Sequence, residues 1–142
     1  MAHNEIPAPL LAAYRQTQYW VHAEPPFLLQ IDKGSEALKT LYREYQVESA
    51  AFITAYNPWS KSLGEAENLA RQSRLEAKMA DAGFPTIPGI GQDPTGEWPG
   101  EISCLILGID RETALRLGKE HEQNAIVWCD SDACPKLLLS KT

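Results

Sequence analysis

FITAYNP, the sequence of residues 52–58, ends an apolar, strand-like run abruptly in an Asn-Pro pair that is followed by a polar loop. Pro58 stops the strand because proline has no backbone N–H to donate to a neighbouring strand, and it restrains Asn57 to extended geometry. We therefore expect a buried strand over Ala51–Tyr56. Its end should place Asn57 at the mouth of a sheet, which is a common position for a binding site.

The segment after this loop has the pattern of a helix from Leu63 to Gly83. Ser62 and Glu65 match the Ser-x-x-Glu capping box, and Gly83 suits the helix C-terminus. One stripe of this helix steps by four, three and four residues, through Asn68, Gln72, Leu75 and Met79. A neighbouring face of mostly small residues is expected to lie close on the sheet: Ala66, Leu69, Ala70, Ser73, Ala77 and Ala80.

The rest of the central segment predicts three strands and one more helix. Strands are expected at Thr86–Gly91 and Glu101–Leu107, joined by a turn over Asp93–Gly96. Asp110 should cap a helix that precedes a core strand at Ala125–Cys129. From residue 51 to residue 129 the order is βαββαβ, which is the split βαβ or ferredoxin-like arrangement. The predicted fold class is therefore α+β with this core.

The two ends of the chain are expected to extend the core. Residues 1–48 contain patterns for a helix at 9–17, strands at 19–22 and 27–32, and a helix capped by Ser35 with a buried face of Leu38, Leu41, Tyr42 and Tyr45. Residues 130–142 include a candidate edge strand at Lys136–Leu139. A chain of 142 residues fits one domain, residues 1–142.

Composition excludes some classes of partner. The 13 Lys and Arg against 19 Asp and Glu give a net charge of −6, which disfavours nucleic acid and anionic membranes. Residues 1–5 lack the features of a secretory signal, so a cytoplasmic location is expected. Cys104, Cys129 and Cys134 are predicted to be reduced thiols, with Cys104 buried in an apolar strand. They lack further Cys or His at ligand spacing, so neither a structural zinc nor a cofactor is predicted.

The predicted topology brings polar residues from separate segments to one end of the sheet. The expected ligand-binding residues are Asn57, Asn68, Arg71, Gln72, Gln123 and Asn124. The forked cation of Arg71 suits an anionic or nucleotide-like ligand. Asp93 and Glu101 face each other across one hairpin and are the candidate acid and base, in hydrolytic or transfer chemistry. The same two carboxylates also suit a metal ligated by oxygen, or the capping of turn amides.

Other interpretations stay open at this point. The amides could instead tie loops together, with Arg71 paired to Asp93 or Glu101. Trp98 either stacks on a ligand or packs on the hairpin, and His121 is expected to be a packing residue. The alternative function is a non-catalytic interaction or regulatory module. In that case a partner or a second copy in a homodimer would bind an exposed sheet face or an edge strand formed by Tyr19, Trp20 and Val21.

Four segments of the chain also resemble a known family. They are residues 52–58, Glu67-Asn68 with Arg71, the glycine- and proline-rich segment 88–98, and Gln123-Asn124-Ala125. Together they resemble a bacterial family known as domain of unknown function 3293. The resemblance implies a small, stand-alone bacterial protein and brings no established activity. His121 stands where the resemblance leads us to expect Phe, which argues against a catalytic role for this residue.

Overall fold

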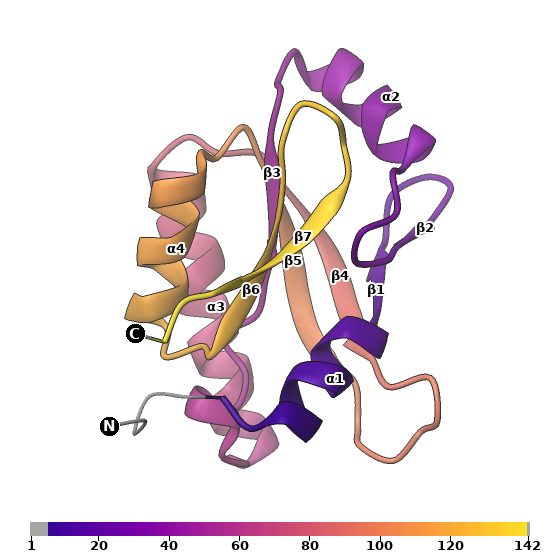
Figure 1. The fold of residues 1–142 in the computed structure, drawn as a ribbon. Helices are drawn as coiled ribbons and strands as arrows, with labels where there is room; N and C mark the ends of the chain where they lie inside the picture. Colours follow the sequence, from indigo (N-terminus) through magenta and orange to yellow (C-terminus); the bar gives the residue numbers. More distant parts are fainter. Residues whose placement is uncertain (1–5, 142) are drawn as a thin grey trace.

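Seven strands form one antiparallel sheet in this computed structural model, which describes residues 6–141. The sheet order is β2-β1-β4-β5-β3-β6-β7 (Figure 1). The strands are β1 (Gln18–Val21), β2 (Phe27–Leu29), β3 (Ala50–Ile53), β4 (Thr86–Gln92), β5 (Glu101–Leu107), β6 (Ala125–Cys129) and β7 (Pro135–Leu139). The helices are α1 (Ala8–Gln16), α2 (Glu36–Tyr45), α3 (Glu65–Asp81) and α4 (Arg111–Glu120), with a 3₁₀ turn η1 (Pro58–Ser60). The predicted α+β class is confirmed; the expectation for residues 1–5 lies outside the described residues.

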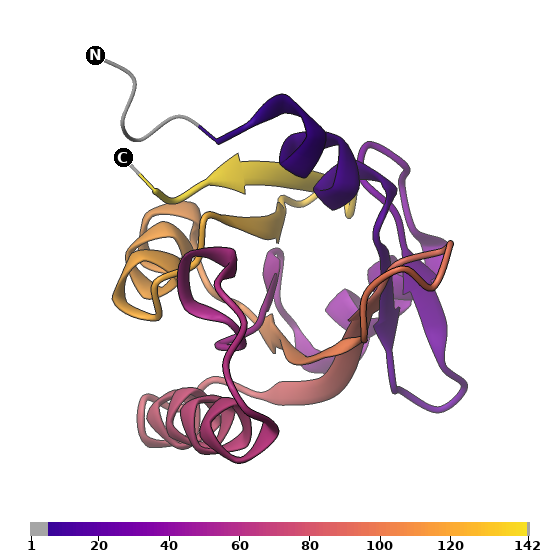
Figure 2. The ribbon, with the colours of Figure 1, turned by 90° about the horizontal axis from the view of Figure 1, so that it is seen from below.

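The sheet curls, and its two faces build two separate cores (Figure 2). Side chains alternate along β3, so Ala51 and Ile53 face outward while Ala50 and Phe52 face inward. The outer face packs against α3 and α4 through residues such as Leu75, Ile106 and Leu117. The inner core contains Leu105, Leu107, Val127 and the buried side of α2. Cys104 is buried in the outer core, as its apolar context predicted.

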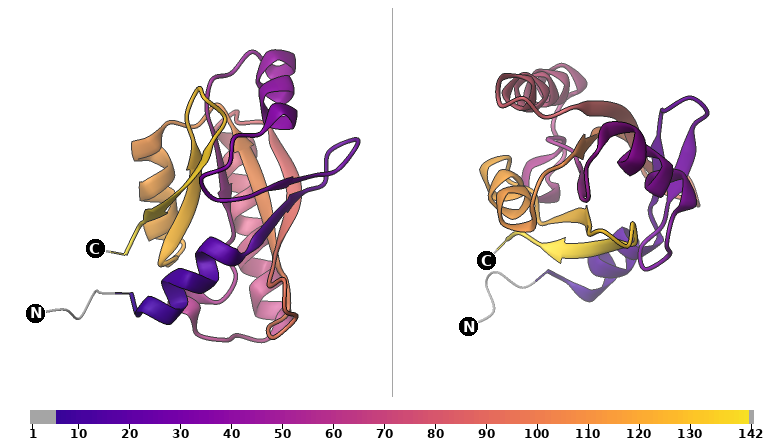
Figure 3. Two further views of the ribbon diagram at one scale, coloured as in Figure 1. Left: turned by 45° about the vertical axis from the view of Figure 1, so that its right-hand side comes forward. Right: turned by 90° about the horizontal axis from the view of Figure 1, so that it is seen from above.

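α2 fills the inner side of the curled sheet at one end (Figure 3). Its predicted cap is confirmed, because Ser35 Oγ accepts a hydrogen bond from the Leu38 N–H at 3.0 Å. The Tyr42 hydroxyl donates to the carbonyl oxygen of Asp130 at 2.9 Å, which ties the helix to the end of β6. By contrast, α1 at the other end of the sheet buries none of its residues.

Two predictions about α3 had different outcomes. Its buried residues are the predicted stripe of Asn68, Gln72, Leu75 and Met79. The prediction of a capping box formed by Ser62 and Glu65 was wrong. The helix begins at Glu65, and its N-cap residue is Gly64, which has no side chain to cap it. The small-residue face does not pack on the sheet either: Leu69, for example, is 43% exposed. The stripe that contains Asn68 and Gln72 faces the sheet instead, because these two amides accept hydrogen bonds from backbone N–H groups just beyond β3.

One of the two expected sheet edges differs from the prediction. β1 pairs with β2 on one side and with β4 on the other, so Tyr19, Trp20 and Val21 do not form an edge. The edge strands are β2 and β7. Within residues 6–141, no helix has both the length and the apolar character needed to cross a membrane.

Gly89 in β4 lies so close to the backbone of β1 and to the Phe52 ring that a side chain does not fit there. A Cβ at this position would lie 2.5 Å from the Trp20 carbonyl oxygen and 2.7 Å from Cε2 of the Phe52 ring. Gly91, two residues later on the same strand, has room, because its nearest neighbour would be Thr17 Cγ2 at 3.6 Å. The inner face of β4 therefore needs glycine at position 89 and tolerates a methyl group at position 91.

Gly89→Ala should lower the free energy of unfolding by roughly 1–3 kcal/mol, the usual cost of overpacking a core. Gly91→Ala is the matched control and should change it by no more than about 1 kcal/mol. Urea denaturation of both variants measures the difference. Equal stabilities of the two variants would show that the contact between β4 and Phe52 is not tight.

Candidate functional site

A cavity of about 270 Å³ lies on the inner side of the sheet. Its lining residues come from the end of the sheet at which α1 and the two loops 57–64 and 93–100 gather; Figure 1 shows these three segments. Its walls come from α1 (Leu10, Ala13), from the inner faces of the central strands, and from Leu137 of β7. Its inner limit is formed by Phe52 and Tyr19, whose rings meet edge to face with centroids 5.3 Å apart. The cavity is thus the part of the curled sheet's interior that the packed core leaves open.

The lining combines aromatic rings with a single formal charge. Five aromatic side chains contribute: Tyr14, Tyr19, Phe52, Tyr56 and Trp98. Among the lining residues only Glu101 is charged, and no Lys, Arg or His takes part. Trp98 therefore borders the cavity, which is the position that stacking on a ligand would require.

Glu101 is held by Asn57 and has no cationic partner. Asn57 Nδ2 donates to Glu101 Oε2 at 2.7 Å. In the described part of the chain, Oε1 makes no hydrogen bond and the carboxylate joins no ion pair. Burial raises the pKa of Glu101, and the hydrogen bond from Asn57 opposes this shift only in part. One carboxylate oxygen remains as an acceptor for a ligand.

The loop that carries Asn57 is strained. The backbone φ angles of Asn57, Trp59 and Ser60 are 49°, 52° and 62°. These values lie in the left-handed region, which residues other than glycine rarely adopt. The expected extended geometry of Asn57 was therefore wrong. Asparagine tolerates this region better than most residues, and strained backbone of this kind clusters at functional sites.

A pair of asparagines holds this loop in place. The Asn57 N–H donates to Asn68 Oδ1 at 2.9 Å, and Asn68 Nδ2 donates back to Asn57 Oδ1 at 2.9 Å. Asn57 Oδ1 also accepts the Leu63 N–H at 3.0 Å. Asn68 is 4% exposed and does not line the cavity. Its position is that of a support for Asn57.

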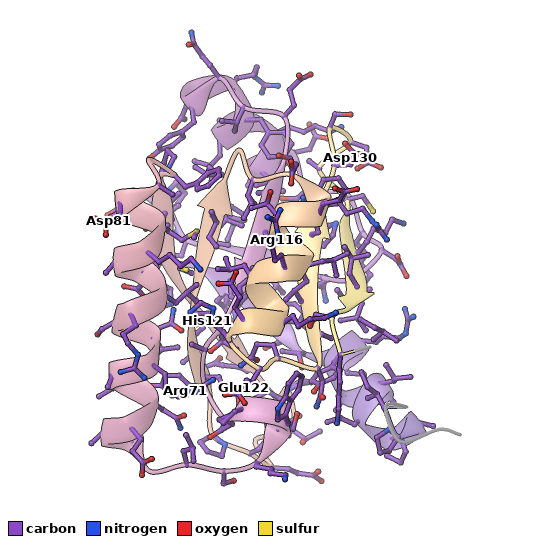
Figure 4. The ribbon with its side chains drawn as sticks, turned by 90° about the vertical axis from the view of Figure 1, so that its left-hand side faces the viewer. Arg71, Asp81, Arg116, His121, Glu122 and Asp130 are labelled. Carbon is purple, nitrogen blue, oxygen red and sulfur yellow. The ribbon has the colours of Figure 1, made fainter. Side chains whose placement is uncertain are left out.

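Gln72 and Arg71 satisfy the backbone beyond β3 from the outer side. Gln72 Oε1 accepts the Ala55 N–H at 2.8 Å, and Arg71 Nε donates to the Ala55 carbonyl oxygen at 2.7 Å. Arg71 also donates to the His121 carbonyl oxygen at 2.7 Å and pairs with Glu122 at 3.3 Å (Figure 4). Arg71 therefore lies away from the cavity, and its partner is neither Asp93 nor Glu101.

Gln123 and Asn124 lie where α4 returns to β6. Gln123 lines the cavity, and its Nε2 donates to the Tyr56 carbonyl oxygen at 3.0 Å. Asn124 Nδ2 donates to Ser60 Oγ at 2.9 Å and to the Tyr14 hydroxyl at 3.2 Å. The Tyr14 and Ser60 hydroxyls are themselves 2.7 Å apart. This triad fastens α1 to the strained loop.

Two buried polar atoms beside the cavity have no hydrogen-bond partner among residues 6–141: the Tyr56 hydroxyl and Asn124 Oδ1. Burial, followed by the nearby Glu65 and Glu101 carboxylates, raises the pKa of Tyr56 to about 12. Buried polar groups are nearly always paired in native proteins. Their location next to the cavity is an independent sign that this end of the sheet is not optimised for stability alone.

Asp93 is in the hairpin turn and not in the cavity lining. Its carboxylate accepts hydrogen bonds from the Thr95 N–H at 3.0 Å, the Thr95 hydroxyl at 2.8 Å and the Glu97 N–H at 2.8 Å. Desolvation opposes their effect, yet these hydrogen bonds lower the pKa of Asp93. Such a group stays ionised and caps the turn, so it is poorly suited to pair with Glu101 as an acid.

Among residues 6–141, no histidine or cysteine lines the cavity. His121 ends α4, where its Nδ1 lies 3.1 Å from the Leu117 carbonyl oxygen, and burial and the neighbouring cations lower its pKa. Cys104, Cys129 and Cys134 form no disulfide. In the described chain, no three or more His, Cys, Asp or Glu side chains are grouped so as to hold a metal ion.

The profile of a protein family of unknown function, DUF3293, matches residues 53–126, just over half of the chain. The chain belongs to this family. The part that matches DUF3293 includes Asn57, Glu101, Trp98 and Gln123, whereas α1 and β1 lie outside it. Searches among curated proteins and among solved structures found no match.

The aromatic wall was the part of the site that sequence reasoning missed. Phe52, Thr54 and Tyr56 alternate along one face of the strand and its continuation, and all three line the cavity. Glu101 and Ser103 do the same on β5, where the inner face changes from polar to apolar at Leu105. Period-two alternation in FITAYNP and in β5 was the signal that could have found this wall.

Arg71→Met should lower the free energy of unfolding by about 1–3 kcal/mol. It leaves the Ala55 carbonyl oxygen without this donor and the His121 carbonyl oxygen with Gln123 Nε2 alone. The pair with Glu122 adds little, since that carboxylate is 45% exposed. Arg74→Met, at an exposed position on the same helix, should cost no more than about 0.5 kcal/mol. Thermal and urea unfolding test both. A fully stable Arg71→Met protein would refute the structural role of Arg71.

Glu101→Gln should make the protein more stable than wild type at pH 7, with a difference that shrinks as pH falls toward 4.5, the ordinary pKa of the group. The folded state holds the Glu101 proton more tightly than the unfolded chain, so raising the pH through the folded-state pKa costs the wild type stability. Glutamine can still accept from Asn57. Melting temperatures across this pH range measure the effect, and a difference that grew as pH fell would contradict it.

Proposed function

We propose that this protein binds a small organic molecule in the cavity between α1, β5 and the loop 57–60. The observation that carries this proposal is the partly buried Glu101 carboxylate in an aromatic-lined cavity. Asn57 holds one of its oxygens, and the other has no hydrogen-bond partner among residues 6–141. Cavities that bind small molecules are mostly apolar and contain a few fixed polar groups. The strained loop and the two unpaired polar atoms beside the cavity support the same location.

The lining favours a different ligand from the anionic one expected from sequence. That expectation depended on Arg71, whose donors are directed to carbonyl oxygens and Glu122 outside the cavity. Without a lining cation, an anion would have to approach Glu101 uncompensated. A neutral or cationic molecule with a flat apolar part fits better, and a nucleobase-like ring without its phosphate remains compatible with this description.

The geometry supports binding more than nucleophilic catalysis. The Ser103 hydroxyl donates to the Glu101 carbonyl oxygen at 2.9 Å, and the Thr54 hydroxyl donates to the Ile102 carbonyl oxygen at 2.6 Å. Neither hydroxyl meets a general base, which a nucleophile requires. If chemistry occurs here, Glu101 is the residue that would exchange a proton, since its raised pKa suits that task.

The arrangement of the central strands supports the finer fold assignment that we propose, a ferredoxin-like split βαβ core. Strands β6, β3, β5 and β4 are adjacent in that order, and each neighbouring pair is antiparallel. α3 and α4 pack on the same face of these strands. Strands β1, β2 and β7 then extend the core at both edges and curl it around the cavity.

A pair of neighbouring substitutions on α1 tests the proposed binding function. Ala13 lines the cavity, whereas Ala12 is exposed on the same helix and does not. Ala13→Phe should fill the cavity and weaken the binding of small aromatic fragments by roughly tenfold or more, which corresponds to about 1.4 kcal/mol. Ala12→Phe should leave it unchanged.

The measurement is ligand-observed NMR with a fragment library, followed by titration of each hit against wild type and both variants. In spectra of the ¹⁵N-labelled protein, a shift of the Trp98 indole N–H resonance then reports whether a hit occupies the cavity. The proposal fails if no fragment binds, or if the hits bind Ala13→Phe as tightly as wild type.

A further inference from the structure

We infer, building on the cavity-binding function proposed above, that the ligand is an organic ammonium compound whose charged nitrogen lies beside Glu101 among the aromatic rings. The inference goes beyond a general binding site because it fixes the sign of the ligand's charge. It depends on three features of the cavity: an uncompensated carboxylate, a set of aromatic rings, and the absence of lining cations.

The first feature is the state of Glu101. Burying an ionised carboxylate is costly unless a cation or several hydrogen bonds compensate it. Glu101 has a single hydrogen-bond donor, Asn57 Nδ2, and none of the ion pairs formed within residues 6–141 includes it. A cationic ligand would supply the missing compensation. The Oε1 atom is positioned to accept a hydrogen bond from it.

The second feature is the aromatic wall. A cation over the face of an aromatic ring is attracted by the ring's quadrupole, and several rings together form the cages that bind ammonium groups. Tyr14, Tyr19, Phe52, Tyr56 and Trp98 contribute from four separate segments of the chain to one cavity of about 270 Å³. Aliphatic side chains would serve equally well to make the wall apolar, so the five aromatic rings favour a ligand that interacts with ring faces.

The third feature is electrostatic and extends over the whole protein. A net charge of −6 attracts cations to the surface and repels anions. On the outer face, Arg71 and Lys78 are paired with Glu122 and Glu120. Two further cations, Lys61 and Lys141, belong to segments beside this end, and the Lys141 ammonium lies over the Trp59 ring. None of these four side chains lines the cavity, so Glu101 is the formal charge within the lining.

A neutral ligand is the serious alternative, because a protonated Glu101 would accommodate it. The two cases differ in how binding depends on pH. The titratable groups that lie close to the Glu101 carboxyl are the phenols of Tyr19 and Tyr56. Burial raises the pKa of both phenols, so neither ionises near neutral pH. Any proton exchanged when a cation binds below pH 7 therefore comes from Glu101, and binding should release it.

Three probes of similar shape separate these cases: benzylamine, which is protonated at neutral pH, benzyl alcohol, which is neutral, and benzoate, which is anionic. Calorimetric titration at pH 7 should show benzylammonium binding roughly tenfold or more tightly than benzyl alcohol, and benzoate binding least. Lowering the pH through the Glu101 titration should weaken benzylammonium binding. Titration in two buffers with different ionisation enthalpies should then show proton release.

Variants assign the effect to Glu101. Glu101→Gln should abolish the preference for benzylammonium over benzyl alcohol, chiefly by lowering the affinity for benzylammonium. Glu97→Gln, in the exposed part of the same hairpin, removes the same formal charge outside the cavity and should preserve the preference. Ala13→Phe should weaken both probes and so confirm that they occupy the cavity.

The outcomes distinguish this inference from the function on which it is built. If benzyl alcohol or benzoate binds as tightly as benzylammonium and Ala13→Phe weakens that binding, the cavity binds ligands but the ammonium assignment is wrong. A preference that persists in Glu101→Gln overturns it as well. If none of the three probes binds at millimolar concentration, the ammonium inference fails, and the fragment library decides separately whether the cavity binds anything.

Discussion

The hydrogen bonds of one side chain, Asn57, connect the outer helix layer to the interior of the sheet. Its amide oxygen accepts from Asn68 on α3, and its amide nitrogen donates to Glu101 on β5. The backbone between these contacts is left-handed, a conformation that would not persist without them. Loss of this side chain would remove its hydrogen bonds to the Leu63 N–H, to Asn68 and to Glu101 together. The position of the Glu101 carboxylate and the shape of the loop therefore depend on the same residue.

The polar residues that the sequence predicted as one site lie on two different sides of the sheet. The amides of Asn68 and Gln72 and the guanidinium of Arg71 serve the backbone that leaves β3 on its outer side. Asn57, Glu101 and Gln123 are the predicted site residues that reach the inner side. The outer set stabilises the strained loop, and the inner set borders the part of the sheet's interior that the packed core leaves open.

Most secondary structure could be predicted from sequence because local rules decide it. β5 and β6 have the predicted bounds, and Ser35 and Asp110 cap their helices, since alternation and capping are properties of a few consecutive residues. The βαββαβ order also predicted that Asn57 and Glu101 would lie at the same end of the sheet, where they form a hydrogen bond. The curl of the sheet was not, because it depends on β1 and β7 wrapping toward each other. Without the curl, there was no reason to place Tyr14 and Tyr19 beside Glu101 or to exclude Arg71.

The way α1 is attached has a consequence for exchange between the cavity and solvent. This helix forms a wall of the cavity yet buries none of its residues, and the Tyr14 hydroxyl links it to Ser60 and Asn124. Segments with few buried contacts open locally at a small fraction of the free energy of global unfolding. Under the proposed binding function, a ligand would enter or leave by displacement of α1 while the seven-stranded sheet stays intact. The rate of exchange and the stability of the fold would then be set by different parts of the chain.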